Sequence, residues 1–209
     1  MKLLLALERY LQNKPELGRE HCEQIQDMID RGAAVVLSKE VLEAWDGDYH
    51  YLPIVGVKGK GTLRVCFDAA RRQGGHPSLN DCLYKGPDRF VNNLLSVILA
   101  FRNGRVGCVA DIKKFHNQVY LFDEDVHMQR FLWRGLNPDI PPQTLAVAVN
   151  NFGVTSANCI ATCALRNSAD KFASVYPVES LEVKHQTYID EGLTAAPSMA
   201  GCNQNRALG

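Results

Sequence analysis

The sequence has no long apolar run, no cysteine framework and no excess of one charge, and each absence excludes a class of protein. No stretch approaches the roughly 18 apolar residues of a membrane-spanning helix, and the apolar segment Leu3–Leu7 is too short for a secretion signal. Seven cysteines without a CxxC pair indicate reduced thiols in an intracellular protein, not a zinc site or a disulfide framework. Lys+Arg and Asp+Glu both number 23, a balance that does not favour a general nucleic-acid binder.

What is present is an ordinary globular composition with an uneven charge distribution. Hydrophobic residues make up 46% and charged residues 22% of the chain, which fits one large domain or two small ones. Between Lys58 and Lys114, 11 basic residues stand against 4 acidic ones, a net charge of +7 that the flanking segments cancel. A basic section with acidic flanks fits phosphate binding near metal-binding carboxylates, and it also fits attraction between domains.

Apolar periodicity predicts helices and strands along the whole chain. Helices are expected over residues 2–31 with a break at Pro15, over a short stretch after Ser38, over 87–102 and over 155–176. Strands are expected over residues 49–57, 63–67, 107–111, 128–133, 145–149 and 183–189. Between the first two strands, GVKGKGT predicts a hairpin turn that presents Lys58 and Lys60, because the helix that a phosphate loop requires does not follow.

Acidic residues stand at the ends of two of these predicted strands. Asp111 ends one apolar strand, and Asp190 and Glu191 follow another. Most acidic pairs in loops are only solvated, and that interpretation stays open for each acid by itself. If both strands belong to one sheet, the carboxylates repel each other, and a divalent cation removes the conflict. Mg²⁺ prefers oxygen ligands, and two ions about 4 Å apart can activate a 3′-hydroxyl and stabilise a leaving pyrophosphate.

Six motifs, in order along the chain, carry a resemblance to a known family. They are RVCFDAA, SLNDCLYKGPD, VADIKKFHNQV, RFLWR, NNFGVTSANCIA and YIDEGLT. Together they resemble the reverse transcriptase of Pao/BEL-type LTR retrotransposons, over residues 5 to 197. The resemblance implies an α+β fold, the fingers and palm of a right-hand polymerase, with a mixed or antiparallel sheet and helices packed on one face. It implies a helical segment over 1–48, fingers over 49–106, a partial palm over 107–197 and an unpatterned tail over 198–209.

The resemblance also gives roles to individual residues. Asp111 matches the family's first metal-binding aspartate, and Asp190 and Glu191 match the two aspartates of its Tyr-Val-Asp-Asp motif. These three residues are therefore the expected catalytic residues and ligands of two Mg²⁺ or Mn²⁺ ions. Among the expected nucleotide-binding residues, Arg64 binds the triphosphate together with Lys58 or Lys60. Phe115 and His116 are expected to stand at the gate for the sugar 2′ position, and Gly153 to lie over the nucleotide and template.

Three residues depart from the family pattern. Glu191 stands where the family has an aspartate, and its extra methylene moves the carboxylate by about 1.5 Å, whereas productive geometry tolerates roughly 0.5 Å. His116 replaces an aromatic residue, usually Phe, and Asn158 replaces a proline. Because 18 residues follow Glu191, the thumb and the RNase H region are expected to be missing, so the chain is expected to be weak or inactive.

The resemblance thus implies a retrotransposon reverse transcriptase fragment, an RNA-directed DNA polymerase by ancestry. Its expected partners are a primed RNA or DNA template and deoxynucleoside triphosphates, with no membrane partner. Its expected location is intracellular, in the cytoplasm or in particles derived from the element, and it is not secreted. The alternative function is a non-catalytic relic or a domesticated module that binds nucleic acid through the basic section, and the oligomeric state stays open.

Overall fold

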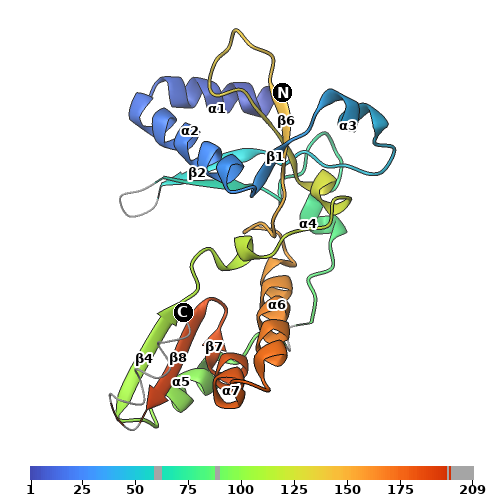
Figure 1. Cartoon of the computed structure of the whole chain (residues 1–209). Coiled ribbons are helices and arrows are strands. Elements are labelled where there is room, and N and C mark those ends of the chain that lie inside the picture. The colour runs from blue at the N-terminus through green and yellow to red at the C-terminus, as the bar shows by residue number, and fades with distance from the viewer. Residues whose placement is uncertain (59–62, 88–89, 197, 199–209) are drawn as a thin grey trace. The chain divides into compact units, whose positions relative to one another are not determined.

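The computed structural model describes residues 1–58, 63–87, 90–196 and 198. It has a mixed α+β architecture with antiparallel sheets, as the sequence predicts (Figure 1). The chain divides into two compact units, each formed by two segments of the chain. The first unit comprises residues 1–84 and 116–157, and the second comprises 85–115 and 158–209. The predicted boundaries of fingers and palm stay a prediction.

Two helices open the first unit, as predicted. α1 (Lys2–Gln12) and α2 (Pro15–Asp30) are separated by a short break. Pro15 occupies the first turn of α2, where the N–H that proline lacks would have no partner within the helix. Gly32 follows the end of α2 with φ +68°, a left-handed conformation that glycine adopts without a side-chain clash.

A three-stranded antiparallel sheet in the order β1-β6-β5 lies in the first unit. Its strands are β1 (Ala34–Val36), β5 (Arg130–Trp133) and β6 (Gln143–Val147). The strands predicted over 128–133 and 145–149 are confirmed with shifted ends, whereas β1 was not predicted. The hydrophobic core of this unit joins the sheet to α1 and α2, and its most deeply buried residues include Ile25, Phe131, Leu145, Val147 and Val149.

An antiparallel hairpin of β2 (Ile54–Lys58) and β3 (Leu63–Phe67) also belongs to the first unit, as predicted. The turn that joins the two strands, with Lys60, lies outside the described residues. The predicted start of the first strand at residue 49 is wrong, because residues 49–53 form only an isolated bridge between Tyr51 and Arg130. Pro53 explains the late start, since its missing N–H cannot take part in a strand ladder.

Short helices in the first unit begin at polar caps. In α3 (Lys39–Ala44) the Ser38 side chain accepts a hydrogen bond from the Val41 N–H, so the predicted cap is confirmed. In α4 (Leu79–Cys82) Ser78 and Asp81 form a reciprocal capping box. A 3₁₀ segment, η3 (Asp125–Gln129), leads into β5. The cap residues satisfy N–H groups that a short helix leaves without partners.

The second unit contains a three-stranded antiparallel sheet in the order β4-β8-β7. Its elements are α5 (Leu94–Phe101), β4 (Val106–Asp111), α6 (Ala157–Phe172), α7 (Pro177–Gln186), β7 (Thr187–Tyr188) and β8 (Glu191–Ala196). α5 and α7 contact each other and both contact β7 and β8. The Ser180 hydroxyl on α7 donates to the Ala169 carbonyl on α6 at 2.6 Å, which joins these two helices.

The strand predicted over residues 183–189 is wrong, because α7 continues to Gln186 and leaves β7 with two residues. Val183, Thr187 and Ile189 are β-branched residues, which favour strands. Local signals for a helix are stronger, however: Pro177 stands in its first turn, and basic residues stand in its last turn, where the helix dipole favours positive charge.

The other two helices predicted in this part of the chain are confirmed with later starts. The one predicted over 87–102 begins at Leu94, where the Asn93 side chain accepts a hydrogen bond from the Ser96 N–H. The one predicted over 155–176 runs from Ala157 to Phe172. Both differences lie at helix ends, where local capping decides the boundary.

Among the cysteines that the structure describes, all but one are reduced as predicted. Five carry free thiols, namely Cys22, Cys66, Cys82, Cys159 and Cys163. Cys108 on β4 is disulfide-bonded, so the expectation of reduced thiols throughout is wrong for this residue. Cysteine spacing alone cannot identify such a bond, because disulfide pairing depends on the fold. Among the helices of the described residues, none is long and apolar enough to cross a membrane.

Candidate functional site

The three predicted metal ligands lie at one end of the sheet in the second unit. Asp111 is the last residue of β4, Glu191 is the first residue of β8, and the two are direct cross-strand partners. Asp190 lies in the two-residue turn that joins β7 to β8. Sheet register therefore brings together acids that stand far apart in the sequence.

Direct pairing places the side chains of Asp111 and Glu191 on the same face of the sheet. Such partners have Cβ atoms about 5 Å apart, and like charges at this separation destabilise the pair. Both side chains are exposed and Asp190 is half-buried, so water screens part of the repulsion. A divalent cation would offset the repulsion that remains, because it favours the charged form of every carboxylate near it.

The turn that carries Asp190 is strained at Ile189. Tyr188 pairs with Glu191, so Ile189 and Asp190 are the central residues of a hairpin turn. Ile189 has φ +57°, which is rare for a β-branched residue. Positive φ at the first central residue is typical of type II′ turns, whose twist suits a hairpin. Strain of this kind costs about 1–3 kcal/mol and is concentrated at functional sites.

A backbone hydrogen bond ties this turn to the strand that carries Asp111. The Ile112 N–H, one residue beyond Asp111, donates to the Asp190 carbonyl at 2.9 Å. The Phe115 N–H in turn donates to the Ile112 carbonyl at 3.1 Å. The backbone around both aspartates is thus held by hydrogen bonds, and the carboxylates are left to move on their own rotatable bonds.

The donor set has the chemistry of a magnesium or manganese site. All three donors are carboxylates, which suit Mg²⁺ and Mn²⁺ better than metals that prefer thiolate or imidazole. Within the part of the chain that the structure describes, no group of three or more His, Cys, Asp or Glu is arranged to hold a metal ion. Mg²⁺ commonly keeps several waters and takes one or two carboxylates plus substrate phosphates, so two of these acids fit its needs.

The predicted nucleotide-binding residues divide between the two units. Arg64, Lys58, His116 and Gly153 belong to the first unit, whereas Phe115 belongs to the second unit with the acids. Arg64 lies on β3 with an exposed side chain, as a residue that grips phosphate requires. Lys58 is the last residue of β2.

The two residues at the predicted gate are both buried. Phe115 and His116 are adjacent in the 3₁₀ segment η2 (Phe115–Gln118), with exposed fractions of 5% and 8%. The His116 ring contacts the Phe152 ring edge-on, with centroids 5.5 Å apart and an interplanar angle of 74°. Phe152 itself is 66% exposed. The exposed aromatic surface beside His116 therefore belongs to Phe152, which the sequence did not single out.

Gly153 lies in a loop conformation that disfavours any other residue. Its φ is +104°, and a Cβ there would lie 3.2 Å from the Phe67 carbonyl oxygen. Asn80 fixes this loop, because its Nδ2 donates to the Gly153 carbonyl at 3.0 Å and its Oδ1 accepts from the Thr155 N–H at 2.8 Å. Asn80 is part of the SLND motif, but sequence gave no signal for its contact with a loop 73 residues away.

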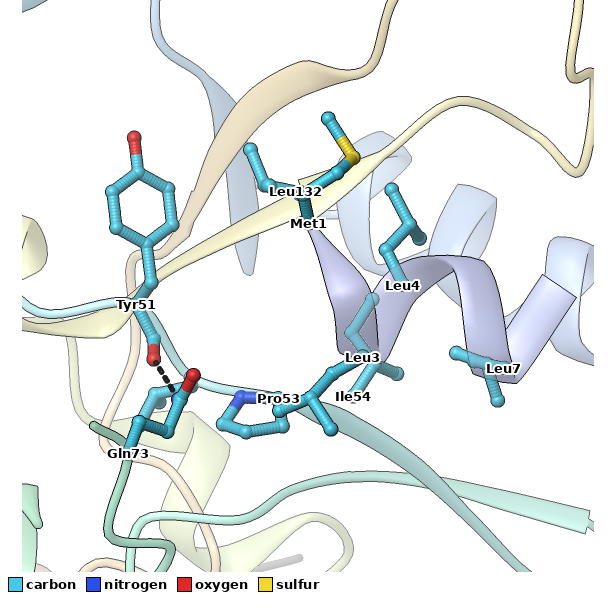
Figure 2. A pocket seen from close by; sticks show the side chains of 10 residues that line it. Met1, Leu3, Leu4, Leu7, Tyr51, Pro53, Ile54, Gln73 and Leu132 are labelled. Carbon is cyan, nitrogen blue, oxygen red and sulfur yellow. Dashed lines mark hydrogen bonds between the residues drawn. The ribbon is translucent and has the colours of Figure 1, made fainter. Parts of the chain in front are cut away.

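An apolar pocket of about 340 Å³ in the first unit contains none of the predicted site residues (Figure 2). Leu3, Leu4 and Leu7 of α1 form one side of it, and the segment that begins at Tyr51 lies across from them. The Gln73 amide donates to the Tyr51 carbonyl at 3.3 Å at its margin. No charged side chain is among its lining residues, so the acid-bearing turn remains the candidate for catalysis.

No model of a known protein family matches the chain, and no curated protein matches it. A function for the chain is therefore argued from its residues and from the geometry around Asp111, Asp190 and Glu191.

Proposed function

We propose that the chain is the fingers and palm of a reverse transcriptase similar to those of Pao/BEL-type LTR retrotransposons. Its reaction is RNA-directed DNA synthesis by two-metal nucleotidyl transfer. The observation that supports this most directly is the cross-strand pairing of Asp111 with Glu191 beside the turn at Asp190. Like charges in direct register weaken a sheet, so this arrangement is understandable if a cation binds there.

In this proposal the carboxylates of Asp111, Asp190 and Glu191 would hold the metal ions, with one or two of these acids on each ion. When bound, Mg²⁺ or Mn²⁺ supplies activation of the primer 3′-hydroxyl and stabilisation of the leaving pyrophosphate. The strained turn at Ile189 and its hydrogen bond to Ile112 keep the Asp190 backbone close to the end of β4. The protein's own contribution is to hold the backbone that carries these like charges in one register before the metal arrives.

The remaining roles concern the incoming nucleotide. Arg64 on β3, with Lys58 or Lys60 from the adjoining hairpin, donates to the triphosphate and offsets its charge. His116, whose ring lies edge-on to Phe152, is assigned the role of screening the sugar. These groups do not react; they orient the nucleotide for in-line attack.

Primer extension on an RNA template tests this proposal. The purified chain is expected to extend a DNA primer slowly with Mg²⁺ or Mn²⁺, because Glu191 replaces an aspartate at a metal-binding position. Asp111→Ala is expected to abolish extension. Asp123→Ala removes the same charge at an exposed position of the first unit and is the matched control, expected to leave extension unchanged. If neither metal supports extension, the enzymatic part of the proposal is rejected for this chain.

A second function, RNA binding without catalysis, is favoured by exposure of the basic section. The Lys and Arg side chains of this section whose exposure the structure describes are all exposed: Arg64, Arg71, Arg72, Lys85, Arg102, Arg105, Lys113 and Lys114. Exposed cations bind phosphates with a strong dependence on salt. Salt-sensitive binding of labelled RNA that Asp190→Ala leaves unchanged, together with no primer extension, would support this second function over the first.

A further inference from the structure

We propose that Asn92 and Arg166 are positioning residues that hold the turn carrying Asp190 and Glu191. They touch neither substrate nor metal, and they act through the backbone that leads into the turn. The importance of this pair for catalysis rests on the proposed function, whereas its hold on the turn can be tested without it. We refer to Asn92 and Arg166 together as the turn anchor.

Asn92 binds two carbonyl groups that precede the turn. Its Nδ2 donates to the Lys184 carbonyl at 2.9 Å and to the Thr187 carbonyl at 2.7 Å. Lys184 is in the last turn of α7, where helix carbonyls lack partners within the helix. Thr187 begins β7, the outer strand in the order β4-β8-β7. A single amide group therefore connects the end of a helix to the start of the hairpin that carries the acids.

Arg166 fixes the orientation of that amide group. Its Nη2 donates to the Asn92 Oδ1 at 2.9 Å and to the Lys184 carbonyl at 3.3 Å. A guanidinium can only donate hydrogen bonds, so Asn92 must present its oxygen to Arg166 and its NH₂ group to the two carbonyls. Arg166 lies on α6 and Asn92 lies just before α5. The turn anchor thereby joins α6, the end of α7 and the segment before α5 to β7.

The turn requires such an anchor because its backbone is strained. Ile189 has φ +57°, and a conformation of this kind persists only where the surrounding structure over-determines it. Thr187, two residues earlier, is held by Asn92, and Asp190, one residue later, is held by the Ile112 N–H. These two points on either side of Ile189 hold the turn beside the end of β4, where Glu191 pairs with Asp111.

The hydrogen bonds of the turn anchor do more than contribute to the folding stability of the second unit. Thr187 is 8% exposed, so an unpaired carbonyl there would be costly and the bond from Asn92 is important. In the described part of the chain, however, the buried Nε of Arg166 has no hydrogen-bond partner. A guanidinium with one unsatisfied nitrogen contributes less to folding than a fully bonded one. The bonds that Arg166 does make direct the Asn92 amide.

Amide hydrogen exchange followed by NMR separates positioning from general stabilisation. In Asn92→Ala, exchange of the Ile112 amide is expected to accelerate by about tenfold or more, because its acceptor on Asp190 moves. Amides within α6, such as that of Leu165, are expected to stay within about twofold of the wild-type protein. The matched control is Asn167→Ala, an exposed asparagine on α6, which is expected to leave the Ile112 amide unchanged.

The same experiment has results that overturn the proposal. An unchanged Ile112 amide in Asn92→Ala would show that the turn does not depend on the anchor. Equal acceleration of all amides in the second unit would show a general loss of stability. If Asn92→Ala does not fold, Arg166→Met, which keeps the bulk of the side chain and removes its donors, is measured against the same criteria. If neither variant folds, the pair is a folding element and the positioning role is rejected.

Binding of Mn²⁺ to the full chain, followed by electron paramagnetic resonance, tests the link to the proposed function. Asn92→Ala is expected to weaken Mn²⁺ binding by about tenfold, as is typical when residues that orient metal ligands are removed. Asn167→Ala is expected to leave it unchanged. If the wild-type chain binds no Mn²⁺, the proposed metal site fails, while hydrogen exchange at Ile112 still decides whether the anchor holds the turn.

Discussion

A buried histidine makes the stability of the first unit depend on pH. His21 on α2 is 0% exposed, and its ring stacks on Trp133 with centroids 5.1 Å apart and an interplanar angle of 27°. Neither ring nitrogen has a hydrogen-bond partner among the described residues. Burial lowers the pKa of His21 from 6.5 to about 4, because the charged imidazolium would lose its hydration.

The direction of this pKa shift sets the sign of the pH dependence. Below pH 6.5 the unfolded chain binds a proton at His21, whereas the folded chain stays neutral until the pH reaches about 4. The unfolded state therefore binds more protons in this window, and the free energy of unfolding falls as the pH falls. A pKa shift of this size corresponds to about 3 kcal/mol. That is a large part of the roughly 5–15 kcal/mol that stabilises a typical domain.

His21→Phe keeps a ring against Trp133 and removes the titrating group. At about pH 7 the variant is expected to gain about 1 kcal/mol, because two unsatisfied nitrogens leave the core. As the pH falls to about 4, the difference in unfolding free energy between variant and wild type is expected to grow by a further 3 kcal/mol, roughly. Urea unfolding followed by circular dichroism, repeated at several pH values for both proteins, measures this difference.

The difference in unfolding free energy between His21→Phe and the wild-type protein does not contain the contribution of other titrating groups. Burial also lowers the pKa of His50 and of His127, and Arg130 adds to the shift at His127, but both histidines are present in each protein. A free-energy difference that stays constant across the pH range would refute the reasoning. It would mean that the His21 ring takes up its proton equally well in the folded and unfolded chains.

The remaining predictions concern an ion pair, a glycine and the departure at the metal site. Arg134→Met is expected to lower the urea midpoint far more than Arg31→Met, because it leaves the buried carboxylate of Glu8 without its bidentate partner; equal midpoints would contradict this. Gly153→Ala is expected to cost about 1–3 kcal/mol in thermal unfolding, owing to φ +104° and a carbonyl in contact, and an unchanged Tm would refute it. Glu191→Asp is expected to raise primer extension by about tenfold or more, since small misplacements of catalytic groups cost large factors; a lower rate would show that Glu191 suits its site.

Local features of the sequence were sufficient to predict much of the first unit. Pro15 and Ser38 act within a turn of the chain, and the helices that they begin were predicted with small errors at the ends. The end of α7 was predicted as a strand, because the segment from Val183 to Ile189 contains three β-branched residues. Whether such a segment forms a helix is settled by capping and by packing against α5 and β8, and packing partners cannot be read from a local pattern.

For the candidate site, the sequence predicted acids at strand ends but not how the strands pair. The acids were expected at strand ends, and the structure places Asp111 and Glu191 in direct register. Register itself depends on contacts between distant segments, so the sequence alone could not specify it. Asn92 lies 92 and 95 residues from the two carbonyls that it binds. A polar side chain with partners so remote has the same appearance in the sequence as any solvated asparagine.

The division of the chain into interleaved segments has a consequence for how the protein can be dissected. The backbone passes between the units after Tyr84, after Phe115 and after Ala157. No continuous fragment contains either unit whole and free of the other, so deletion from one end cannot isolate a unit. Replacing the intervening segment with a short linker, so that the two segments of one unit are joined directly, is the way to isolate it. The bond between Phe115 and His116 is one of the three passages, so the two residues at the predicted gate stand where one unit is covalently continued by the other.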